Sequence, residues 1–308
     1  MVLRLRKPRV QDDLGLGLKA GPGRALNQDG SFNLRKKGLP ATPSRELYHH
    51  LITMSWPRFL GLLLLGFLLA NAAFAGLYLA IGMDHFARPG GASLADRALD
   101  AFFFSAQTLT TVGYGHISPM GLVASAAAAF ESLLGLLSFA LATGLLYGRF
   151  SRPQACIRFS RRAVVAPYQE TTGLMFRLAN LRSSQLIEVE VTVGLAFTDP
   201  ATNLRRYTLL PLERDKIHLF PSSWTVVHPI DAHSPLAGLD DAALRAARAV
   251  LIVLIKAFDD TFSQTIYART SYLAEEVVWN ARFTPMIQAG EDGVLEMDLS
   301  RIDGLEPV

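Results

Sequence analysis

The chain has 308 residues, 50% of them hydrophobic, and its mean hydropathy of +0.24 is high for a soluble globular protein. This length is sufficient for two structural units. The formal net charge is only +3, so the distribution of charge along the chain is more informative than its sum. A single cysteine, Cys156, excludes an intrachain disulfide framework. We expect it to be a small packed side chain in a reducing compartment rather than a nucleophile.

The N-terminal part precedes the first long apolar segment. Residues 1–43 are rich in Gly, Pro, Lys and Arg, and we expect them to form a mostly disordered arm. SRELYHHLITMSWP (44–57) predicts an amphipathic helix, because Leu47, Leu51 and further apolar residues recur at helical spacing. Pro57 is expected to separate this helix from the apolar segment. The pattern favours a helix lying in the headgroup plane, and a cytosolic extension of the following segment is the alternative.

Two segments are long and apolar enough to cross a membrane. FLGLLLLGFLLANAAFAGLYLAI (59–81) has no charged residue, and MGLVASAAAAFESLLGLLSFALATGLLYG (120–148) has one, Glu131. As a helix, the first would measure about 34 Å, more than the roughly 30 Å of a bilayer core. Residues 1–57 hold ten Lys/Arg against four Asp/Glu, and five arginines follow the second span. We therefore expect both termini on the cytoplasmic side of the membrane and the loop at 82–119 outside.

The loop between the spans contains a short helical pattern followed by the run TVGYG. LADRALDAFFFSAQTLT (94–110) predicts a pore helix over 96–110, too short and too charged at its start to span a membrane. It can enter from outside and stop partway, with TVGYG (111–115) as the returning strand. Irregular backbone at this depth is tolerated only where it is buried in protein or lines a watery cavity, so the arrangement predicts a pore.

The residue types of TVGYG suit the binding of K⁺ as a selectivity filter. Gly113 and Gly115 can adopt positive φ, which lets successive carbonyl groups point the same way. Thr111 adds a hydroxyl oxygen, while Val112 and Tyr114 are expected to pack outward, the tyrosine against pore-helix aromatics. Four copies around an axis would stack rings of oxygens that replace the hydration shell of K⁺. The negative C-terminal end of the pore helix also favours a cation.

Several stretches carry a resemblance to a known family. In the pore region they are SAQTLTTVGYG, SWP before the first span and RFSRP after the second. In the C-terminal half they are LMFRLANLRSSQLIEVEV (174–191), VVHPIDAHSPLAGL (226–239) and ARTSYLAEEVVWNARFTPMI (268–287). These stretches are similar to bacterial inward-rectifier-type potassium channels, the KirBac family, and to the cytoplasmic domain shared by prokaryotic and eukaryotic inward rectifiers. The similarity covers roughly residues 44–290.

The C-terminal half, 151–308, has the pattern of a β-sandwich. IEVEVTVGLAF alternates apolar and polar residues, and AVLIVLIKAF (249–258) indicates a buried strand. The resemblance implies an immunoglobulin-like fold for this half. We therefore expect a multi-domain membrane protein: an α-helical two-span pore domain (58–150) with a re-entrant pore helix and filter, and a cytoplasmic immunoglobulin-like β-sandwich with a regulatory role. One pore loop per chain cannot enclose a pore, so the chain is expected to form a homotetramer.

The second span supplies the predicted gate. Gly135 and Gly144 relieve packing and permit bending, so they are the predicted hinges. By resemblance, Phe139 faces the cavity and Tyr147 lies at the gate constriction. Strong rectifiers carry an acid at the position of Phe139, so block by Mg²⁺ or polyamines is expected to be weaker here. The positions assigned to the pore lining and gate are Thr110, Glu131, Phe139, Thr143, Gly144 and Tyr147.

Two polar residues near the filter leave questions open. Glu131 is an acid inside the membrane, and it either supports the pore helix or faces the cavity. Gln107 stands where the family usually has a glutamate behind the filter. An amide can still form a hydrogen bond with the filter backbone, but its effect on filter stability is not fixed by the sequence.

Charged residues outside the spans suggest two further sites. By resemblance, Glu188 and either Asp259 or Asp260 line a cytoplasmic vestibule, where rings of acids would attract K⁺, Mg²⁺ or polyamines. A solvated strand face and an ordinary turn are the alternatives, and Lys256 nearby would weaken the acidic ring. Residues expected at the headgroups, where anionic phospholipids would bind, are Trp56, Arg58, Arg149, Arg152, Arg158, Arg161 and Arg162.

These features favour a passive, tetrameric potassium channel that is gated at the inner helix crossing and modulated by its cytoplasmic domain and by anionic lipids. A potassium transporter subunit and a β-sandwich sensor without a pore are the alternatives. We expect no enzymatic activity, no nucleic-acid partner and no cofactor. The expected ligands are K⁺ ions at Thr111, Val112, Gly113 and Tyr114, with Mg²⁺, Ba²⁺ or polyamines as blockers.

Overall fold

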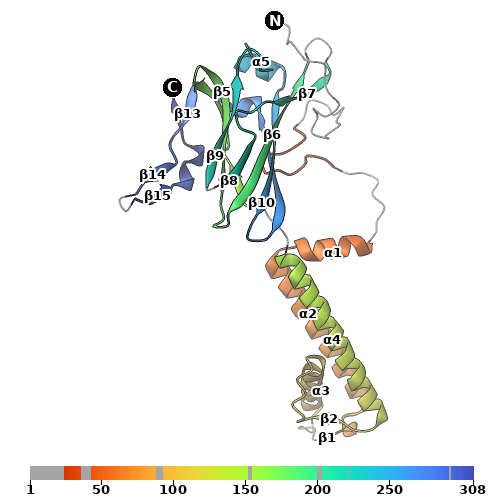
Figure 1. Ribbon diagram of the computed structural model, residues 1–308. Coiled ribbons are helices and arrows are strands. Elements are labelled where there is room, and N and C mark those ends of the chain that lie inside the picture. Colours follow the sequence, from red (N-terminus) through yellow and green to blue (C-terminus); the bar gives the residue numbers. More distant parts are fainter. Residues whose placement is uncertain are drawn as a thin grey trace. The chain divides into compact units, whose positions relative to one another are not determined.

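The computed structural model describes residues 24–35, 43–87, 93–151, 155–199, 203–220, 222–290 and 293–308 (Figure 1). The chain divides into two compact units, which are taken separately here. The helical unit spans Leu39–Arg152, and the β unit combines Met1–Gly38 with Pro153–Val308.

The helical unit contains two long and two shorter helices. The long ones are α2 (Trp56–Ile81) and α4 (Leu122–Phe150), and the shorter ones are α1 (Pro43–Thr53) and α3 (Leu94–Leu109). Within the described ranges, α2 and α4 are the helices long and apolar enough to cross a membrane. Many of their apolar side chains are exposed, as is Leu69 with 61% of its surface, whereas a core helix of a soluble protein buries such residues.

The break between α1 and α2 differs from the predicted one. The sequence predicts that Pro57 separates a helix at 44–57 from the first span, and this prediction is wrong. The break lies at Met54 and Ser55, and Pro57 belongs to the first turn of α2. Proline is well tolerated there because the first N–H groups of a helix have no intrahelical partner.

An aromatic cluster holds α3 against α2. The rings of Tyr78, Phe86 and Phe104 contact one another edge to face, with centroids 5.0 to 5.3 Å apart. All three side chains are at most 4% exposed. Edge-to-face packing is the favoured geometry of aromatic pairs, so this cluster fixes the start of the loop and the middle of α3 on the first long helix.

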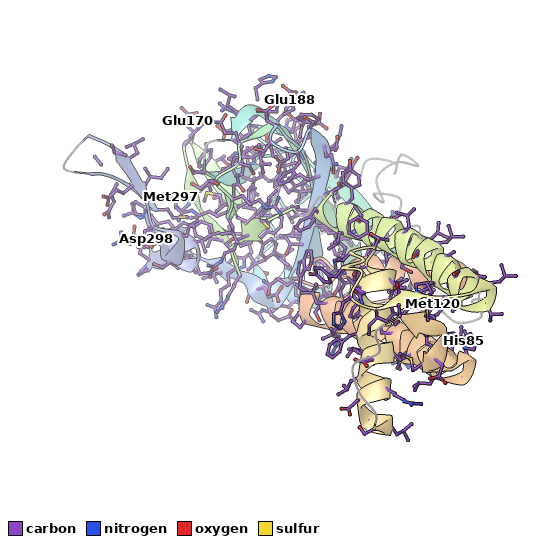
Figure 2. The ribbon with its side chains drawn as sticks, turned by 90° about the horizontal axis from the view of Figure 1, so that it is seen from below. His85, Met120, Glu170, Glu188, Met297 and Asp298 are labelled. Carbon is purple, nitrogen blue, oxygen red and sulfur yellow. The ribbon has the colours of Figure 1, made fainter. Side chains whose placement is uncertain are left out.

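The loop around α3 is closed at its base. After η1 (Met83–His85), β1 (Phe86–Ala87) pairs antiparallel with β2 (Ser118–Pro119). The backbone N–H of Met120 donates to the carbonyl of His85 at 2.7 Å, and both residues are labelled in Figure 2. The segments before α3 and after TVGYG are thereby hydrogen-bonded to each other. The pore loop therefore leaves α2 and returns to α4 at the same place.

The β unit is a sandwich of two five-stranded sheets. One has the order β11-β10-β6-β7, with β8 also paired to β6, and the other has the order β12-β4-β5-β3, with β9 also paired to β5. Pairing is antiparallel except between β12 and β4. The strands are β3 (Ile157–Phe159), β4 (Ala163–Tyr168), β5 (Thr171–Asn180), β6 (Leu186–Thr198), β7 (Arg205–Leu210), β8 (Lys216–Phe220), β9 (Ser223–Ile230), β10 (Val250–Asp259), β11 (Gln264–Leu273) and β12 (Val277–Trp279).

Shorter elements complete the β unit. They are α5 (Asp241–Ala246), η2 (Ala274–Glu276), η3 (Leu299–Asp303), the pair β13 (Ala281–Phe283) and β16 (Leu305–Pro307), and the pair β14 (Ile287–Ala289) and β15 (Leu295–Met297). β15 ends at Met297, and Asp298 after it is the N-cap of η3; Figure 2 labels both residues.

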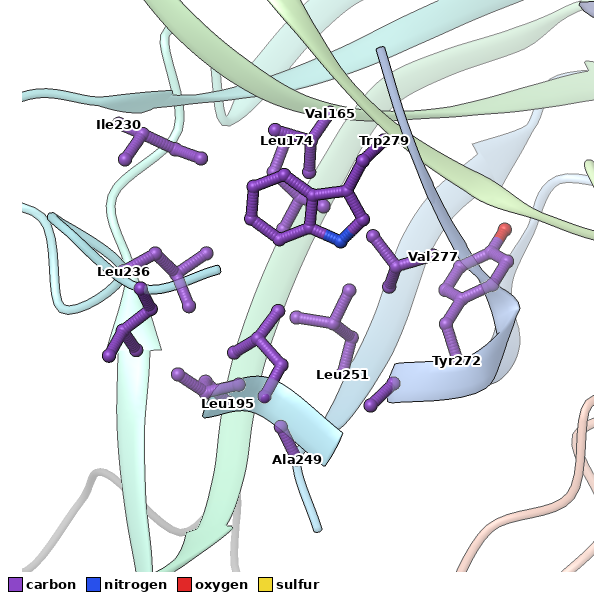
Figure 3. Close-up of a pocket in the computed structure, with 13 residues that line it drawn as sticks. Val165, Leu174, Leu195, Ile230, Leu236, Ala249, Leu251, Tyr272, Val277 and Trp279 are labelled. Atoms are coloured by element: carbon purple, nitrogen blue, oxygen red, sulfur yellow. The ribbon is translucent and has the colours of Figure 1, made fainter. Parts of the chain in front are cut away.

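Side chains of both sheets meet in one close-packed core. The alternation predicted for β6 is confirmed for Val189, Val191 and Val193, which are at most 3% exposed. It is not kept at Ile187, which is half-buried beside a shift in the register between β6 and β10. Leu251 and Trp279 line a cavity in this core, shown in Figure 3. Its volume of ≈ 10 Å³ is about that of one water-sized sphere, so it leaves no room for a ligand.

Part of the N-terminal arm is an ordered hairpin on the β unit. The prediction of a mostly disordered arm over residues 1–43 is wrong for residues 24–35, while residues 1–23 and 36–42 lie outside the described ranges. Leu26, 3% exposed, packs against Val250 and Ile252 of β10. The hairpin therefore covers a small apolar cluster on the outer face of β6 and β10, separate from the core between the two sheets.

Polar contacts fix the same hairpin. Arg24 donates to both carboxylate oxygens of Glu276, at 2.9 and 3.0 Å, and to the carbonyl of Ser271 at 2.6 Å. At the turn, Gly30 has φ +81°, and a Cβ there would lie 2.6 Å from the carbonyl oxygen of Arg269. The Asp-Gly pair between Leu26 and the next aromatic residue is a turn signal that would have revealed this hairpin in the sequence.

Candidate functional site

The pore helix α3 is capped at its start and points its end at TVGYG. The hydroxyl of Ser93 accepts a hydrogen bond from the N–H of Asp96 at 3.1 Å, which satisfies one of the free donors of the first turn. The helix ends at Leu109 with Thr110 as its C-cap. The C-terminal end of a helix carries a partial negative charge, and here it lies directly before the loop.

The backbone of TVGYG adopts an unusual conformation at three positions. Gly113 and Gly115 have φ values of +55° and +75°, as the sequence predicts for carbonyl groups that point the same way. Thr111 also has a positive φ, +60°. Such a value is uncommon for a residue with a side chain, and no feature of the residue pattern predicts it.

Gln107 connects the pore helix to this strand. Its backbone carbonyl accepts hydrogen bonds from the N–H groups of Val112 and Gly113, at 2.9 and 3.2 Å. Its side-chain Oε1 accepts a third from the N–H of Tyr114, at 3.2 Å. The expectation that an amide at this position bonds the filter backbone is therefore confirmed.

The side chains of TVGYG are left unpacked by their own chain. Val112 is 52% exposed and Tyr114 is 83% exposed. The expected packing of the tyrosine on pore-helix aromatics is therefore not made within the described part of this chain. Two large side chains are thus exposed beside a backbone that Gln107 holds by hydrogen bonds.

Glu131 is buried between three helices. It is 0% exposed, and its two carboxyl oxygens form hydrogen bonds with Tyr78 of α2 and Ser105 of α3. Its assignment to the pore lining is wrong, because no part of the side chain reaches the surface. The alternative, support of the pore helix, agrees with these contacts, which sequence reasoning could not find since they join residues far apart in the chain.

Three other predicted positions form an exposed stripe in the C-terminal half of α4. Phe139, Thr143 and Tyr147 are spaced four residues apart, and the rings of Phe139 and Tyr147 are 73% and 74% exposed. A Cβ on Gly135 would lie 1.9 Å from the carbonyl oxygen of Leu109, so this glycine permits a close helix contact. Gly144 has no such neighbour within 4 Å. The hinge and gate roles stay predictions.

The predicted vestibule acids differ in their surroundings. Glu188, labelled in Figure 2, is exposed and lies 2.6 Å from His218, with Lys216 also bound to its carboxylate. Hydrogen bonds from His218 and Lys216 lower the pKa of Glu188 to about 2, so it is ionised at physiological pH but paired with basic groups. Lys256, expected to weaken the acidic ring, lies 3.4 Å from Glu190.

Asp259 and Asp260 are adjacent in sequence but differ in burial. Asp259 is 1% exposed and accepts hydrogen bonds from the N–H groups of Thr261 and Phe262, at 3.1 and 3.3 Å. It caps the turn after β10 and lies 3.9 Å from Arg182, so its assignment to a vestibule lining is wrong. Asp260 is exposed and stays a candidate.

Arg149 has a structural role in the helical unit. Its guanidinium donates to the carbonyls of Leu51 and Met54, at 2.6 and 2.7 Å, and lies over the rings of Trp56 and Phe59 at 4.6 and 4.5 Å. These carbonyls belong to the end of α1, which favours a cation. This cation therefore joins α1 to α4, and its assignment to lipid binding stays a prediction.

The remaining basic residues are partly paired. Arg158 lies 3.2 Å from Asp303, and Arg161 lies 3.8 Å from the same carboxylate. Arg58 and Arg162 are exposed, whereas Arg152 lies outside the described residues.

A membrane-long helix pair enclosing a short helix and a TVGYG loop, followed by a β-sandwich, defines a two-span ion channel with an appended domain. A family model described as "Ion channel" matches residues 63–152, and one described as "Inward rectifier potassium channel C-terminal domain" matches residues 157–308. The pattern of both units is thus found together in one known class of channel.

Individual relatives give the same result. The chain is 39% identical to "Inward rectifier potassium channel Kirbac3.1" of Paramagnetospirillum magnetotacticum, over 93% of this chain and 97% of that protein. It is 28% identical to the human "ATP-sensitive inward rectifier potassium channel 15", over 96% of this chain and 85% of that protein. The chain belongs to the inward rectifier potassium channel family, and it is a potassium channel of the membrane. This result favours the channel over the transporter and sensor alternatives.

Proposed function

We propose that the chain conducts K⁺ passively as a homotetramer, with residues 111–115 of each subunit lining a selectivity filter. The observation that carries this proposal is the backbone of TVGYG, with positive φ at Thr111, Gly113 and Gly115 and three hydrogen bonds to Gln107. K⁺ would bind to oxygens of Thr111, Val112, Gly113 and Tyr114. Exposed Val112 and Tyr114 support the assembly, since a neighbouring subunit would cover them.

The inner end of the pore is proposed as the gate. The exposed stripe of Phe139, Thr143 and Tyr147 would face the axis, with Tyr147 at the constriction and Gly144 as the hinge. Phe139 offers no charge to a blocking cation, so Mg²⁺ and polyamines would block weakly. Its relatives are ion channels, and we propose that this chain has no enzymatic activity. We propose that it needs no cofactor besides the K⁺ ions of the filter.

The membrane orientation and lipid response are proposed from charge. The excess of Lys and Arg before the first span and after the second supports cytoplasmic termini in a bacterial inner membrane. Exposed Arg58 and Arg162 are the best candidates for contact with anionic phospholipid head groups, each worth about 1 kcal/mol near the surface. Partly paired Arg158 and Arg161 would contribute less.

Uptake of ⁸⁶Rb⁺ into proteoliposomes tests the proposed function. We expect uptake that Ba²⁺ blocks, that strongly exceeds Na⁺ uptake under the same gradient, and that changes with the content of anionic lipid. Uptake without preference for Rb⁺ over Na⁺ would contradict the filter assignment. Uptake that is equal at every anionic lipid content, in the wild type and in Arg58→Ala/Arg162→Ala, would contradict the lipid response alone.

A further inference from the structure

Four buried polar side chains lie together between α2, α3 and α4. Asn71 and Tyr78 come from α2, Ser105 from α3 and Glu131 from α4, and each is 0% exposed. We call them the pore-helix cluster. Burial of a polar group away from water costs free energy unless the group is hydrogen-bonded. The number of donor hydrogen atoms in the cluster should therefore match the number of contacts between its oxygen atoms.

Three contacts within the cluster each join two oxygen atoms. The hydroxyl of Tyr78 contacts Oε2 of Glu131, and the hydroxyl of Ser105 contacts Oε1 of Glu131. Ser105 also lies 3.0 Å from Oδ1 of Asn71. The amide nitrogen of Asn71 donates to the carbonyl of Phe67 at 2.7 Å, which fixes the amide with its oxygen toward Ser105.

Three oxygen pairs need three hydrogen atoms, and the two hydroxyl groups supply only two. With an ionised Glu131, Ser105 would have one hydrogen for two acceptors, and one pair of buried oxygens would face each other without a hydrogen. A proton on Glu131 completes the set. Tyr78 then donates to Oε2, the acid O–H donates to Ser105, and Ser105 donates to Asn71.

The surroundings of Glu131 agree with a neutral acid. The ion pairs found among the described residues do not include it. An ionised carboxylate without a cationic partner in the interior of membrane-long helices would carry a large desolvation cost.

The cluster also sets the position of the pore helix along α4. Glu131 contacts Ser105, and one turn further Gly135 meets the carbonyl of Leu109, so two residues four apart on α4 face two residues four apart on α3. Gln107 lies between these two contacts on α3 and holds the backbone of Val112, Gly113 and Tyr114. A shift of α3 would therefore be passed directly to TVGYG.

We propose that Glu131 carries a proton and acts as a positioning residue for the filter, holding the pore helix in place through hydrogen bonds with Tyr78 and Ser105. This inference rests on the proposed function of residues 111–115 as the K⁺ filter. On this proposal the filter depends on the shape and hydrogen bonds of the Glu131 side chain and does not depend on a negative charge there.

Two substitutions separate shape from charge. Glu131→Gln keeps an acceptor for Tyr78 and a donor for Ser105, so the ratio of Rb⁺ to Na⁺ flux should stay within about twofold of the wild type. Glu131→Leu removes both hydrogen bonds, and the ratio should fall by about tenfold in channels that still assemble as the wild type does. A role in assembly alone would lower the amount of channel but leave the ratio unchanged, which would overturn the positioning role.

Further measurements keep the inference testable if Glu131→Leu does not assemble. Ser105→Ala removes one contact without adding volume and should also lower the flux ratio, so an unchanged ratio in Ser105→Ala counts against positioning. Glu131→Gln with a flux ratio as low as that of Ser105→Ala would show that charge is required. The infrared band of a protonated carboxylic acid should be present in the wild type and absent in Glu131→Gln, and a wild type without it refutes the neutral state.

The proposed function and this inference can fail separately. A wild type without Rb⁺ preference or Ba²⁺ block would refute the filter assignment, whereas the infrared band reports on Glu131 whether or not ions are conducted.

Discussion

Gln107 is the residue through which the end of the pore helix acts on the loop. It accepts hydrogen bonds from three consecutive N–H groups, one of them with its side chain. A glutamate would accept the same bond from Tyr114 but would bring a charge to membrane depth. The amide thus retains the contact while avoiding the need for a cationic partner.

Replacing Gln107 by leucine should therefore loosen the strand at Tyr114. The lost hydrogen bond is worth about 1 kcal/mol, which corresponds to about a fivefold fall in the ratio of Rb⁺ to Na⁺ flux. Gln107→Glu keeps the hydrogen-bond acceptor for Tyr114 and should lower the flux ratio less. Equal flux ratios for Gln107→Leu and the wild type would show that the side-chain bond does not shape the filter.

Gly135 and Gly144 offer a matched pair of substitutions on α4. In Gly135→Ala the new methyl group meets the backbone of Leu109 at 1.9 Å, so either helix must shift, at a cost of about 2 kcal/mol. Gly144→Ala meets nothing within 4 Å and should be tolerated. Thermal unfolding of the assembled channel in detergent should show a lower midpoint for Gly135→Ala only; equal midpoints would contradict the close contact.

At the scale of elements, the N-terminal hairpin behaves as an additional part of the sandwich. Its apolar anchor is Leu26, and its polar anchor is the bidentate pair of Arg24 and Glu276, whose side chains are 18% and 25% exposed. Residues that precede the first span thus pack on the outer face of a domain whose strands all follow the second span. The hairpin makes the domain discontinuous in sequence.

Arg24→Ala should release this hairpin, because the hydrogen bonds from its guanidinium to the carboxylate of Glu276 and the carbonyl of Ser271 are lost. Hydrogen bonds to charged groups contribute about 2 kcal/mol, enough to free the segment for protease attack. Limited proteolysis of the full chain should cut near residues 24–35 faster in this variant. Arg35→Ala, which changes an exposed arginine of the same segment, is the control and should be cut like the wild type.

At the scale of the whole molecule, any single substitution is repeated around the proposed pore axis. Phe139→Asp would place a ring of acids in the cavity in place of phenyl groups, and rings of like charge concentrate counter-ions. Mg²⁺ block of K⁺ current from the inner side should become stronger by about tenfold or more. A block that does not change would mean that Phe139 faces away from the cavity.

Sequence patterns determined the outlines of both units but not their polar contacts. Apolar length marks α2 and α4, alternation marks the middle of β6, and the residue types of TVGYG mark the loop, because each depends on neighbours along the chain. The burial of Asp259 but not Asp260 depends on how one turn closes. The surroundings of Glu131 and Arg149 depend on partners from other helices, which periodicity alone does not reveal.

The pore-helix cluster also has a consequence for how the chain enters the bilayer during synthesis. Asn71 on α2 and Glu131 on α4 each disfavour lipid, yet neither has its full set of hydrogen bonds until α3 brings Ser105 between them. A lone first span, or a lone second span, would meet the lipid with an unpaired polar group. Insertion of the two spans as a joined pair, with the loop already folded between them, avoids that intermediate.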